Sequence, residues 1–488
     1  MAGELKEKVA RGVAWSLGEK VGTMLLQMGV SIVVLNLLMP DDFGVVAILT
    51  AFSAFAVVVV DSGFSQTLIR KAEPSPTDYK SVFLFNIAVS VVLYVLLTAL
   101  APVAARYYDM PVLAHLAPVF FLLIPVNALC GIQNTLFTRE FRFALLSKIT
   151  FVSSLVSGIA AVLLALAGCG VWSLVAQRVL QMVVRAVLLW RASEWRPRRS
   201  VAWSSAAVRQ MAPYSFSLMA TDLISALYNK IPQLFIGKLY SPDTLGFFDQ
   251  ALKLKDLPVT SAMTSVQGVT FPALSKITDD ERKFAESYRQ VMMVVAYVMF
   301  PVMLGLSAVA RDLFAVLLDA KWMPTVPYFE AICLVGLFYP VAMVAYNVMK
   351  VRCSGAVIVR LEIVKKVIMT AILVLTIPRS VQAVVWGLVV FAFCEMVVNV
   401  AASLRVTSLS WLRLLRTLAP IAIAAAVMYG AVRCVAWALP DSALLRLVAE
   451  VGAGIIVYLL FSALFRLEAF AEVRAIARRQ LLKARDEK

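Results

Sequence analysis

Polar and charged residues recur at helical spacing inside several apolar stretches of this chain. One row consists of Ser16, Lys20, Thr23, Gln27 and Ser31, and another of Asp249, Lys253, Asp256, Thr260, Thr264 and Gln267. Two further rows consist of Arg178, Gln181 and Arg185, and of Thr221, Asp222, Ser225, Asn229 and Lys230. Steps of mostly three or four residues place each row on one face of a helix. Because polar groups are costly against hydrocarbon, these faces are expected to line a water-filled cavity or a bundle interior.

The cations of these rows are candidates for binding an anionic ligand, and the neighbouring amides can donate further hydrogen bonds. We predict this role for Lys20, Arg178, Lys230, Lys253, Arg185, Gln27 and Gln181. Arg178 lies roughly 10 Å inside the outer end of its apolar run, so its charge cannot easily reach the aqueous phase. Arg185 lies near the inner end of the same run, where a long side chain can reach the interface. For Lys253 a structural alternative stays open, since Asp249 and Asp256 can neutralise it within one helix.

Acidic residues in the apolar runs have two candidate roles, as counter-ions of the cations or as sites for a coupling cation. They are Asp61, Asp222, Asp249, Asp256, Glu330 and Glu395. The chain has a single histidine, His115, and its six cysteines are scattered singly without the spacing of metal ligands or a disulfide framework. We therefore expect no catalytic residues, no metal site and no cofactor.

Composition determines which elements must position these side chains. The 488 residues are 61% hydrophobic and 16% charged, with a mean hydropathy of +0.85. Many stretches reach the ~20 apolar residues that span a bilayer, which predicts an all-α polytopic membrane protein. Fourteen spans are expected, at 13–39, 43–66, 80–105, 112–137, 145–167, 170–190, 211–239, 244–271, 288–311, 325–349, 356–377, 381–404, 415–438 and 443–465. The first reads as a retained helix, because it carries Glu19 and Lys20 and lacks a small-residue cleavage site.

The basic residues divide unequally between the two sides of this arrangement. Loops and span ends on the side of the N-terminus hold 33 lysines and arginines, whereas the opposite side holds five. The positive-inside rule then predicts that both termini lie in the cytoplasm. These basic residues, on the side that faces anionic lipid, account for most of the net charge of +16. No nucleic acid partner is needed to explain it.

A turn motif occurs twice in the chain. Pro40-Asp41-x-Phe43-Gly44 returns 202 residues later as Pro242-Asp243-x-Leu245-Gly246. Pro, Asp and Gly are turn formers, and repeated hairpins of this kind are typical of transporters built from two related halves. We predict two pseudo-symmetric six-helix lobes, at 1–190 and 211–405, joined by a basic cytoplasmic linker at 191–210. Two additional spans at 406–465 and a basic cytoplasmic tail at 466–488 complete the chain.

Several ordered motifs resemble the polysaccharide-transport, or Wzx-type, flippases of the MATE-like (MOP) superfamily, especially the colanic and teichuronic acid exporter branch. The motifs are Arg11-Gly12-x-x-Trp15-Ser16, Met39-Pro40-Asp41-Asp42-Phe43-Gly44, Asp61-Ser62-Gly63-Phe64-Ser65-Gln66, Asn134-x-x-Phe137-x-Arg139-x-Phe141, Gly168-x-Gly170-Val171-Trp172-Ser173, Ile236-Gly237-Lys238, Phe271-Pro272-Ala273-Leu274-Ser275 and Lys321-Trp322. Together they cover roughly residues 5 to 405. The chain departs from the family at Pro232-Gln233, where relatives often carry an Asp.

The resemblance implies a flippase that opens alternately to each side of the bacterial cytoplasmic (inner) membrane. Its cargo would be an undecaprenyl-pyrophosphate-linked oligosaccharide, such as a repeat unit of O-antigen, capsule or exopolysaccharide, moved from the cytoplasmic to the outer leaflet. No bond is made or broken, so the protein is not expected to be an enzyme. Expected partners are the lipid-linked substrate and membrane lipids, with a polysaccharide polymerase and a chain-length regulator as further candidates.

Three alternatives remain open at this point. A multidrug extruder of the same superfamily would favour a cavity richer in carboxylates, because its usual cargo is cationic. A lipid II flippase for peptidoglycan is a closer alternative, but the motifs quoted above resemble the polysaccharide branch more. A membrane polymerase or acyltransferase would need candidate catalytic residues or a large outward loop, and the sequence has neither.

Overall fold

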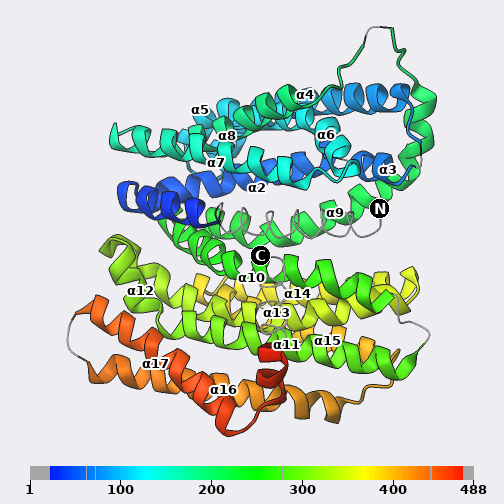
Figure 1. Ribbon diagram of the computed structural model, residues 1–488. Coiled ribbons are helices and arrows are strands. Elements are labelled where there is room, and N and C mark those ends of the chain that lie inside the picture. The colour runs from blue at the N-terminus through cyan, green and yellow to red at the C-terminus, as the bar shows by residue number, and fades with distance from the viewer. Residues whose placement is uncertain are drawn as a thin grey trace, which may run out of the picture. The chain divides into compact units, whose positions relative to one another are not determined.

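The computed structural model describes residues 22, 24–61, 63–71, 73–198, 200–275, 280–439 and 442–475, with backbone alone for 261–275. Every regular element in this part of the chain is a helix (Figure 1), which confirms the predicted all-α class. Lys20 and the predicted basic tail beyond residue 475 lie outside the described residues.

Ten helices or helix pairs among the described residues are long and apolar enough to cross a membrane. They are α2 with α3 (Pro40–Asp61, Phe64–Arg70), α4 (Pro76–Tyr107), α5 with α6 (Val112–Phe120, Leu123–Arg139), α7 (Phe143–Leu166), α8 (Val171–Ala192), α11 (Glu281–Ala308), the 3₁₀ helix η1 with α13 (Ala320–Thr325, Val326–Arg352), α15 (Val381–Leu404), α16 (Trp411–Ala438) and α17 (Ala443–Leu464). The chain is therefore a polytopic membrane protein.

The other four predicted spans correspond to helices that are shorter or more polar. They are the helix Met24–Leu37, α9 (Ser205–Leu239), α10 (Pro242–Ser275) and α14 (Gly355–Thr376). The helix Met24–Leu37 is apolar but short, whereas α9 and α10 carry two of the polar rows identified in the sequence. That the chain crosses the membrane fourteen times stays a prediction.

Side-chain caps explain where several of these helices begin. At α4 the hydroxyl of Ser75 accepts a hydrogen bond from the amide of Asp78 at 3.1 Å, and the Asp78 carboxylate accepts one from the amide of Ser75 at 2.8 Å. This reciprocal capping box satisfies two amides that have no intrahelical partner. Ser204, Asp280 and Ser380 cap α9, α11 and α15 through their side-chain oxygens. Each of these residue types is a preferred N-cap.

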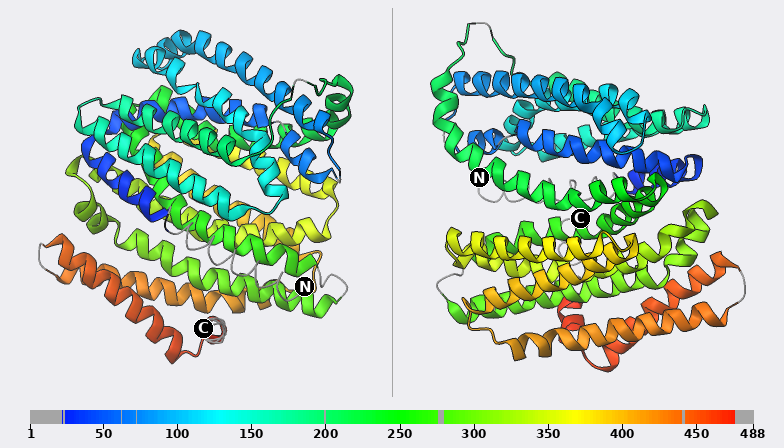
Figure 2. Two further views of the ribbon diagram at one scale, coloured as in Figure 1. Left: turned by 45° about the horizontal axis from the view of Figure 1, so that its top comes forward. Right: turned by 180° about the vertical axis from the view of Figure 1, so that it is seen from behind.

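The chain folds into two compact units, residues 1–249 and 250–488, here called unit 1 and unit 2. In unit 1, α9 packs along α2 and α4, so it groups with the preceding helices (Figure 2). The segment between α8 and α9 is tied to α4, since the Lys80 amine donates to the Arg198 carbonyl at 2.9 Å and the Ser204 amide donates to the Ser81 hydroxyl at 3.0 Å. The first turns of α10 also belong to unit 1. The predicted lobe boundary at 191–210 differs from this compact boundary and stays a prediction.

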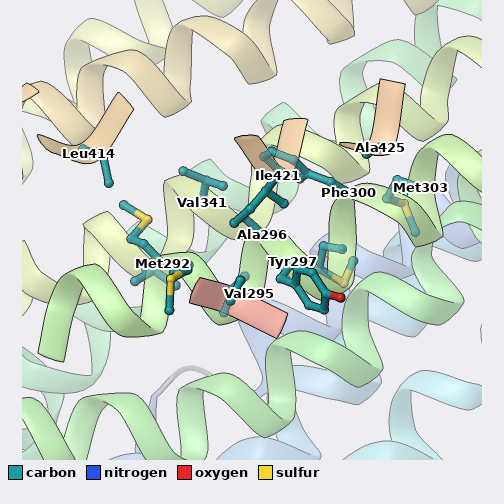
Figure 3. Close-up of a cluster of buried hydrophobic side chains, with 14 of the residues drawn as sticks. Met292, Val295, Ala296, Tyr297, Phe300, Met303, Val341, Leu414, Ile421 and Ala425 are labelled. Carbon is teal, nitrogen blue, oxygen red and sulfur yellow. The ribbon is translucent and has the colours of Figure 1, made fainter. Parts of the chain in front are cut away.

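Unit 2 is organised around a continuous apolar core between α11, α13 and α16 (Figure 3). Met292, Ala296 and Met303 are completely buried in it. The Tyr458 hydroxyl, buried in this core, donates a hydrogen bond to the Tyr297 carbonyl at 2.8 Å, which offsets the cost of its burial. The hairpin of α16 and α17 packs against this core, and Leu467 and Ala469 beyond it are buried as well. The first residues of the predicted tail are thus part of the folded unit.

Candidate functional site

The two copies of the turn motif meet in unit 1. Gly44, in the first turn of α2, lies against the first turn of α10, where a β-carbon at Gly44 would be 2.0 Å from the carbonyl oxygen of Pro242. The relation is reciprocal, because a β-carbon at Gly246 would be 2.0 Å from the carbonyl oxygen of Pro40. No side chain fits at either position without moving a backbone. The repeated glycines therefore permit the close approach of two related helix starts.

Arg178 is exposed, whereas Arg185 and Lys230, the other predicted binding cations among the described residues of unit 1, are half-buried. Arg178 lies about two turns into α8, and its exposure distinguishes it from the buried residues of the helix, which are Ser173, Leu174, Val175, Ala186 and Leu189. Asp249, which is 5% exposed at the end of unit 1, interacts with it electrostatically. A guanidinium open to hydrocarbon would be costly, so the surface that Arg178 faces must be aqueous or ligand-filled. The structure thus brings together candidates from two separate polar rows.

Arg185 and Asp61 form a second polar group in unit 1, where α2, α6 and α8 meet. The Asp61 carboxylate is hydrogen-bonded to the Asn127 side chain and interacts electrostatically with Arg185. Arg185 also donates to the Asn134 side-chain oxygen at 3.4 Å. The sequence placed Arg185 where it could reach the membrane interface, but it lies beside Asp61 and Asn134 instead. Asp61 is thereby a counter-ion of Arg185.

The interruption between α2 and α3 is caused by the backbone conformation of Gly63. Gly63 adopts φ +67°, in the left-handed region, and a β-carbon there would lie 2.7 Å from the carbonyl oxygen of Ser215 on α9. Glycine alone suits both the conformation and the close approach. It ends α2 at Asp61 and starts α3 at Phe64. This break accounts for the glycine of the Asp61-Ser62-Gly63-Phe64 motif.

Gln27 and Gln181 converge on one serine. The Gln181 amide donates to the Ser154 hydroxyl oxygen at 2.9 Å, and the Gln27 amide donates to the same oxygen at 3.2 Å. Ser154 lies on α7, so the three residues join the helix Met24–Leu37 to α7 and α8. The two glutamines were predicted as ligand contacts, and the structure places them at a junction between helices.

The remaining candidates of unit 1 lie on α9. Asp222 is exposed and Lys230 is half-buried. Both lie on the helix that packs along α2, so they share unit 1 with Arg178. The role predicted for them stays a prediction, as does that of Lys20.

The acidic candidates of unit 2 are paired with cations that the sequence reasoning had not matched to them. Lys255 lies 2.5 Å from Asp256, Arg433 lies 3.5 Å from Glu330, and Lys365 lies 3.3 Å from Glu395. Lys253 is half-buried on α10. Asp256, Glu330 and Glu395 therefore act as counter-ions of Lys255, Arg433 and Lys365. Whether any of them also takes up a coupling cation stays a prediction.

Lys365 was missed by the sequence analysis, which counted it among the cytoplasmic charges. It is 3% exposed on α14, 2.5 Å from Glu362, and its amine lies 5.0 Å from the centre of the Tyr346 ring. The buried residues of α14 are Lys365, Met369 and Leu373, one stripe with steps of four. This spacing could have predicted the burial of Lys365, because a lysine at the same helical spacing as the packing residues faces the neighbouring helices.

No group of three or more His, Cys, Asp or Glu side chains suited to a metal ion occurs among the described residues. The polar groups of unit 1 can instead bind by charge and hydrogen bonds. Exposed Arg178 can offer a planar fork of donors, the arrangement that matches phosphate oxygens. In unit 2, the charge of each of the acidic candidates is compensated by the cation that it pairs with.

Known proteins match this chain with low sequence identity over alignments of several hundred residues. The succinoglycan biosynthesis transport protein ExoT of Rhizobium meliloti (strain 1021) is 26% identical over 314 residues, which cover 64% of this chain and 63% of that protein. The teichuronic acid biosynthesis protein TuaB of Bacillus subtilis (strain 168) is 23% identical over 291 residues, 58% of this chain and 59% of that protein. The chain thus aligns with less than two thirds of these relatives.

A solved structure of the lipid II flippase MurJ in its inward closed conformation has the same fold. It superposes with a TM-score of 0.72 over 93% of this chain and 98% of that chain, at 12% sequence identity. In sequence, residues 33–327, more than half of the chain, match the family described as polysaccharide biosynthesis protein. The protein therefore belongs to the polysaccharide biosynthesis protein family, in agreement with the motifs that it carries.

Proposed function

We propose that this protein is a flippase that moves an undecaprenyl-pyrophosphate-linked oligosaccharide from the cytoplasmic to the outer leaflet of the bacterial inner membrane. The observation that carries the proposal is Arg178, an exposed arginine within an apolar span of a polysaccharide biosynthesis family member. The names of the relatives, which refer to transport and synthesis of succinoglycan and teichuronic acid, support the same class of cargo.

The chemistry of the cargo fits the charges of unit 1. A pyrophosphate and acidic sugars cannot cross hydrocarbon bare, because an ion loses its hydration there. Arg178, with Lys20 and Lys230 as further contacts, would replace part of that hydration with charge-assisted hydrogen bonds. Gln27 and Gln181 would hold α8 in place through Ser154. The lipid tail could stay in the bilayer throughout, and no covalent step is required.

Movement of the cargo requires access from each side in turn. The reciprocal backbone contact of Gly44 with Pro242 and of Gly246 with Pro40 would be the closure that separates during transport. With both termini in the cytoplasm, these turns would form the outer end of the pathway. Alternating access would then open the turns to release the cargo outside. A polysaccharide polymerase and a chain-length regulator are the partners that would act on it there.

The test is a deletion strain that carries either the wild-type chain or an empty vector. We expect the lipid-linked oligosaccharide to accumulate on the cytoplasmic face without the protein and to be exported again when the protein is restored. Purified protein in liposomes, loaded with the isolated lipid-linked oligosaccharide, should make the glycan accessible to an external glycosidase. Equal accessibility with and without protein would reject the proposal.

A lipid II flippase is the second candidate, favoured by the fold shared with MurJ over nearly the whole of both chains. The same experiment separates the two, because the glycan on the accumulated lipid differs. A repeat unit of several sugars identifies a polysaccharide precursor. A disaccharide-peptide identifies lipid II.

A further inference from the structure

Glu450 is a fully buried carboxyl group that the transport proposal does not use. It lies on α17, with 0% of its surface exposed, and neither of its side-chain oxygens receives a hydrogen bond from any donor that the structure describes. Asp312 of α12 (Ala310–Leu317), itself 5% exposed, lies within hydrogen-bonding reach of Glu450. Two carboxyl groups from different helices therefore face one another in the interior of unit 2.

The two arginines near Glu450 are already engaged with other carboxylates. Arg446, one turn before it on α17, donates to one oxygen of Asp312 from Nε at 3.2 Å and from Nη2 at 2.7 Å. Arg433 of α16 lies 3.5 Å from Glu330 of α13 and also donates to the Ala308 carbonyl at 3.5 Å. Three carboxylates thus share two guanidiniums. If all three were ionised, one negative charge would be left without compensation.

A proton resolves both the charge and the hydrogen bonding. An isolated ionised carboxylate is very costly in an apolar interior. Two ionised carboxylates are also acceptors only, so they cannot bond to one another, whereas a protonated one can donate to its neighbour. Asp312 has the arginine as its partner and can keep its charge. Glu450 has none, which makes it the carrier of the proton.

We infer that Asp312 and Glu450 form a proton-binding site in unit 2, in which Glu450 carries the proton and donates it in a hydrogen bond to Asp312. The site connects the hairpin of α16 and α17 to α12. When the proton leaves, two carboxylates face each other and the attachment of α17 weakens. The site is independent of the cargo, so it stands or falls separately from the proposed function.

Infrared difference spectroscopy of the full-length protein in nanodiscs tests the protonation directly. At neutral pH, the spectrum of wild type minus Glu450→Gln should contain the C=O band of a protonated carboxylic acid. In Asp312→Asn the band should vanish although Glu450 is still present, because Arg446 then pairs with an ionised Glu450. Glu140→Gln, which removes an exposed carboxylate of unit 1, should leave the band unchanged. Absence of the band in the wild-type difference, or its persistence in Asp312→Asn, would overturn the inference.

Thermal unfolding of the same proteins gives the second measurement. Wild type should lose at least about 2 °C of Tm between pH 5 and pH 9 relative to Glu450→Gln, which keeps the hydrogen bond but cannot release a proton. The pH dependence should be the same in sodium and in potassium chloride. A Tm that rises with sodium in the wild type alone would identify a sodium site and reject the proton. Parallel pH curves for the two proteins would reject a titrating Glu450.

Discussion

Arg178 and Lys365 are both cations within long helices of a membrane protein, and the two units treat them in opposite ways. Unit 1 leaves Arg178 exposed within α8. Unit 2 buries the Lys365 amine to 3% exposure between Glu362, Glu395 and the ring of Tyr346. Arg289 of unit 2 is likewise 8% exposed and bonded to Glu286 and Glu468.

The difference separates two uses of charge inside a membrane protein. A buried ion with its partners in place adds little net stability, but removal of one partner leaves a charge that the interior cannot solvate. An exposed cation has unused hydrogen-bonding capacity that a phosphate can take up. On this contrast we propose that the cations of unit 1 bind the cargo and that the paired charges of unit 2 attach helices to one another. The following experiments test this proposal in order of expected effect.

The largest effect is expected from locking the reciprocal turns of unit 1. Cysteines at Asp42 and Thr244, in a background without the six native cysteines, should crosslink, since the adjacent backbones touch and a disulfide needs Cα atoms within about 7 Å. If the turns must separate for release, export should fall to background and recover on reduction. Each single cysteine variant is the control. Normal export with the pair demonstrably crosslinked would remove the closure from the transport cycle.

Lys365→Ala should lower the free energy of unfolding by about 1–3 kcal/mol, because it leaves the half-buried Glu395 and Glu362 carboxylates without their cation. Replacing the residues together, as Lys365→Met with Glu395→Gln and Glu362→Gln, should recover most of that loss. Chemical denaturation of the detergent-solubilised protein measures both. Arg360→Ala, on the exposed surface of the same helix, should stay within about 0.5 kcal/mol. A Lys365→Ala protein as stable as Arg360→Ala would contradict the attachment role.

The double variant Lys20→Ala with Arg178→Ala should reduce export at least about tenfold while protein level stays near normal. A charged hydrogen bond contributes about 1.5–3 kcal/mol, and 1.4 kcal/mol corresponds to a factor of ten. Export is measured as surface glycan per molecule of membrane protein. Arg191→Ala, at the exposed end of the same helix, controls for loss of one positive charge. Full export by the double variant would remove the case for a cationic cargo site in unit 1.

The smallest effect is expected at Glu468, just beyond α17. A hydrogen bond from Arg289 lowers the pKa of this carboxyl group. The ionised form therefore stabilises the fold above the ordinary pKa, and this contribution is lost as pH falls through the lowered value. Because the side chain is 59% exposed, the contribution should stay below about 1 kcal/mol.

Glu468→Gln should thus destabilise at pH 7 and match the wild type near pH 3, as measured by thermal unfolding. Glu472→Gln is the control, on the same segment without an ion pair of this kind. An equal loss for Glu468→Gln at both pH values would mean that packing, and not the charge, holds this segment to α11.

The repeated turn shows what can and what cannot be predicted from the sequence. Pro40 to Gly44 and Pro242 to Gly246 are visible as a repeat, and turn chemistry predicts that each starts a helix, as α2 and α10 do. The sequence does not show that the glycines of one copy face the proline carbonyls of the other. Only the tertiary structure shows this contact. The contact joins segments 202 residues apart, and nothing in local composition determines which surfaces of two such helices meet.

Local chemistry by itself determined that this chain is an all-helical membrane protein of the polysaccharide biosynthesis family, because apolar length, helical periodicity and ordered motifs are properties of short stretches. It also placed Arg178 in the middle of an apolar span. Tertiary structure alone decided which charges are satisfied: it brought Asp61 to Arg185, Gln27 and Gln181 to Ser154, and buried Lys365 against Glu395. The physical reason is that a charge inside a membrane protein takes its partner from whichever helix packs beside it, and packing depends on the complementarity of whole surfaces.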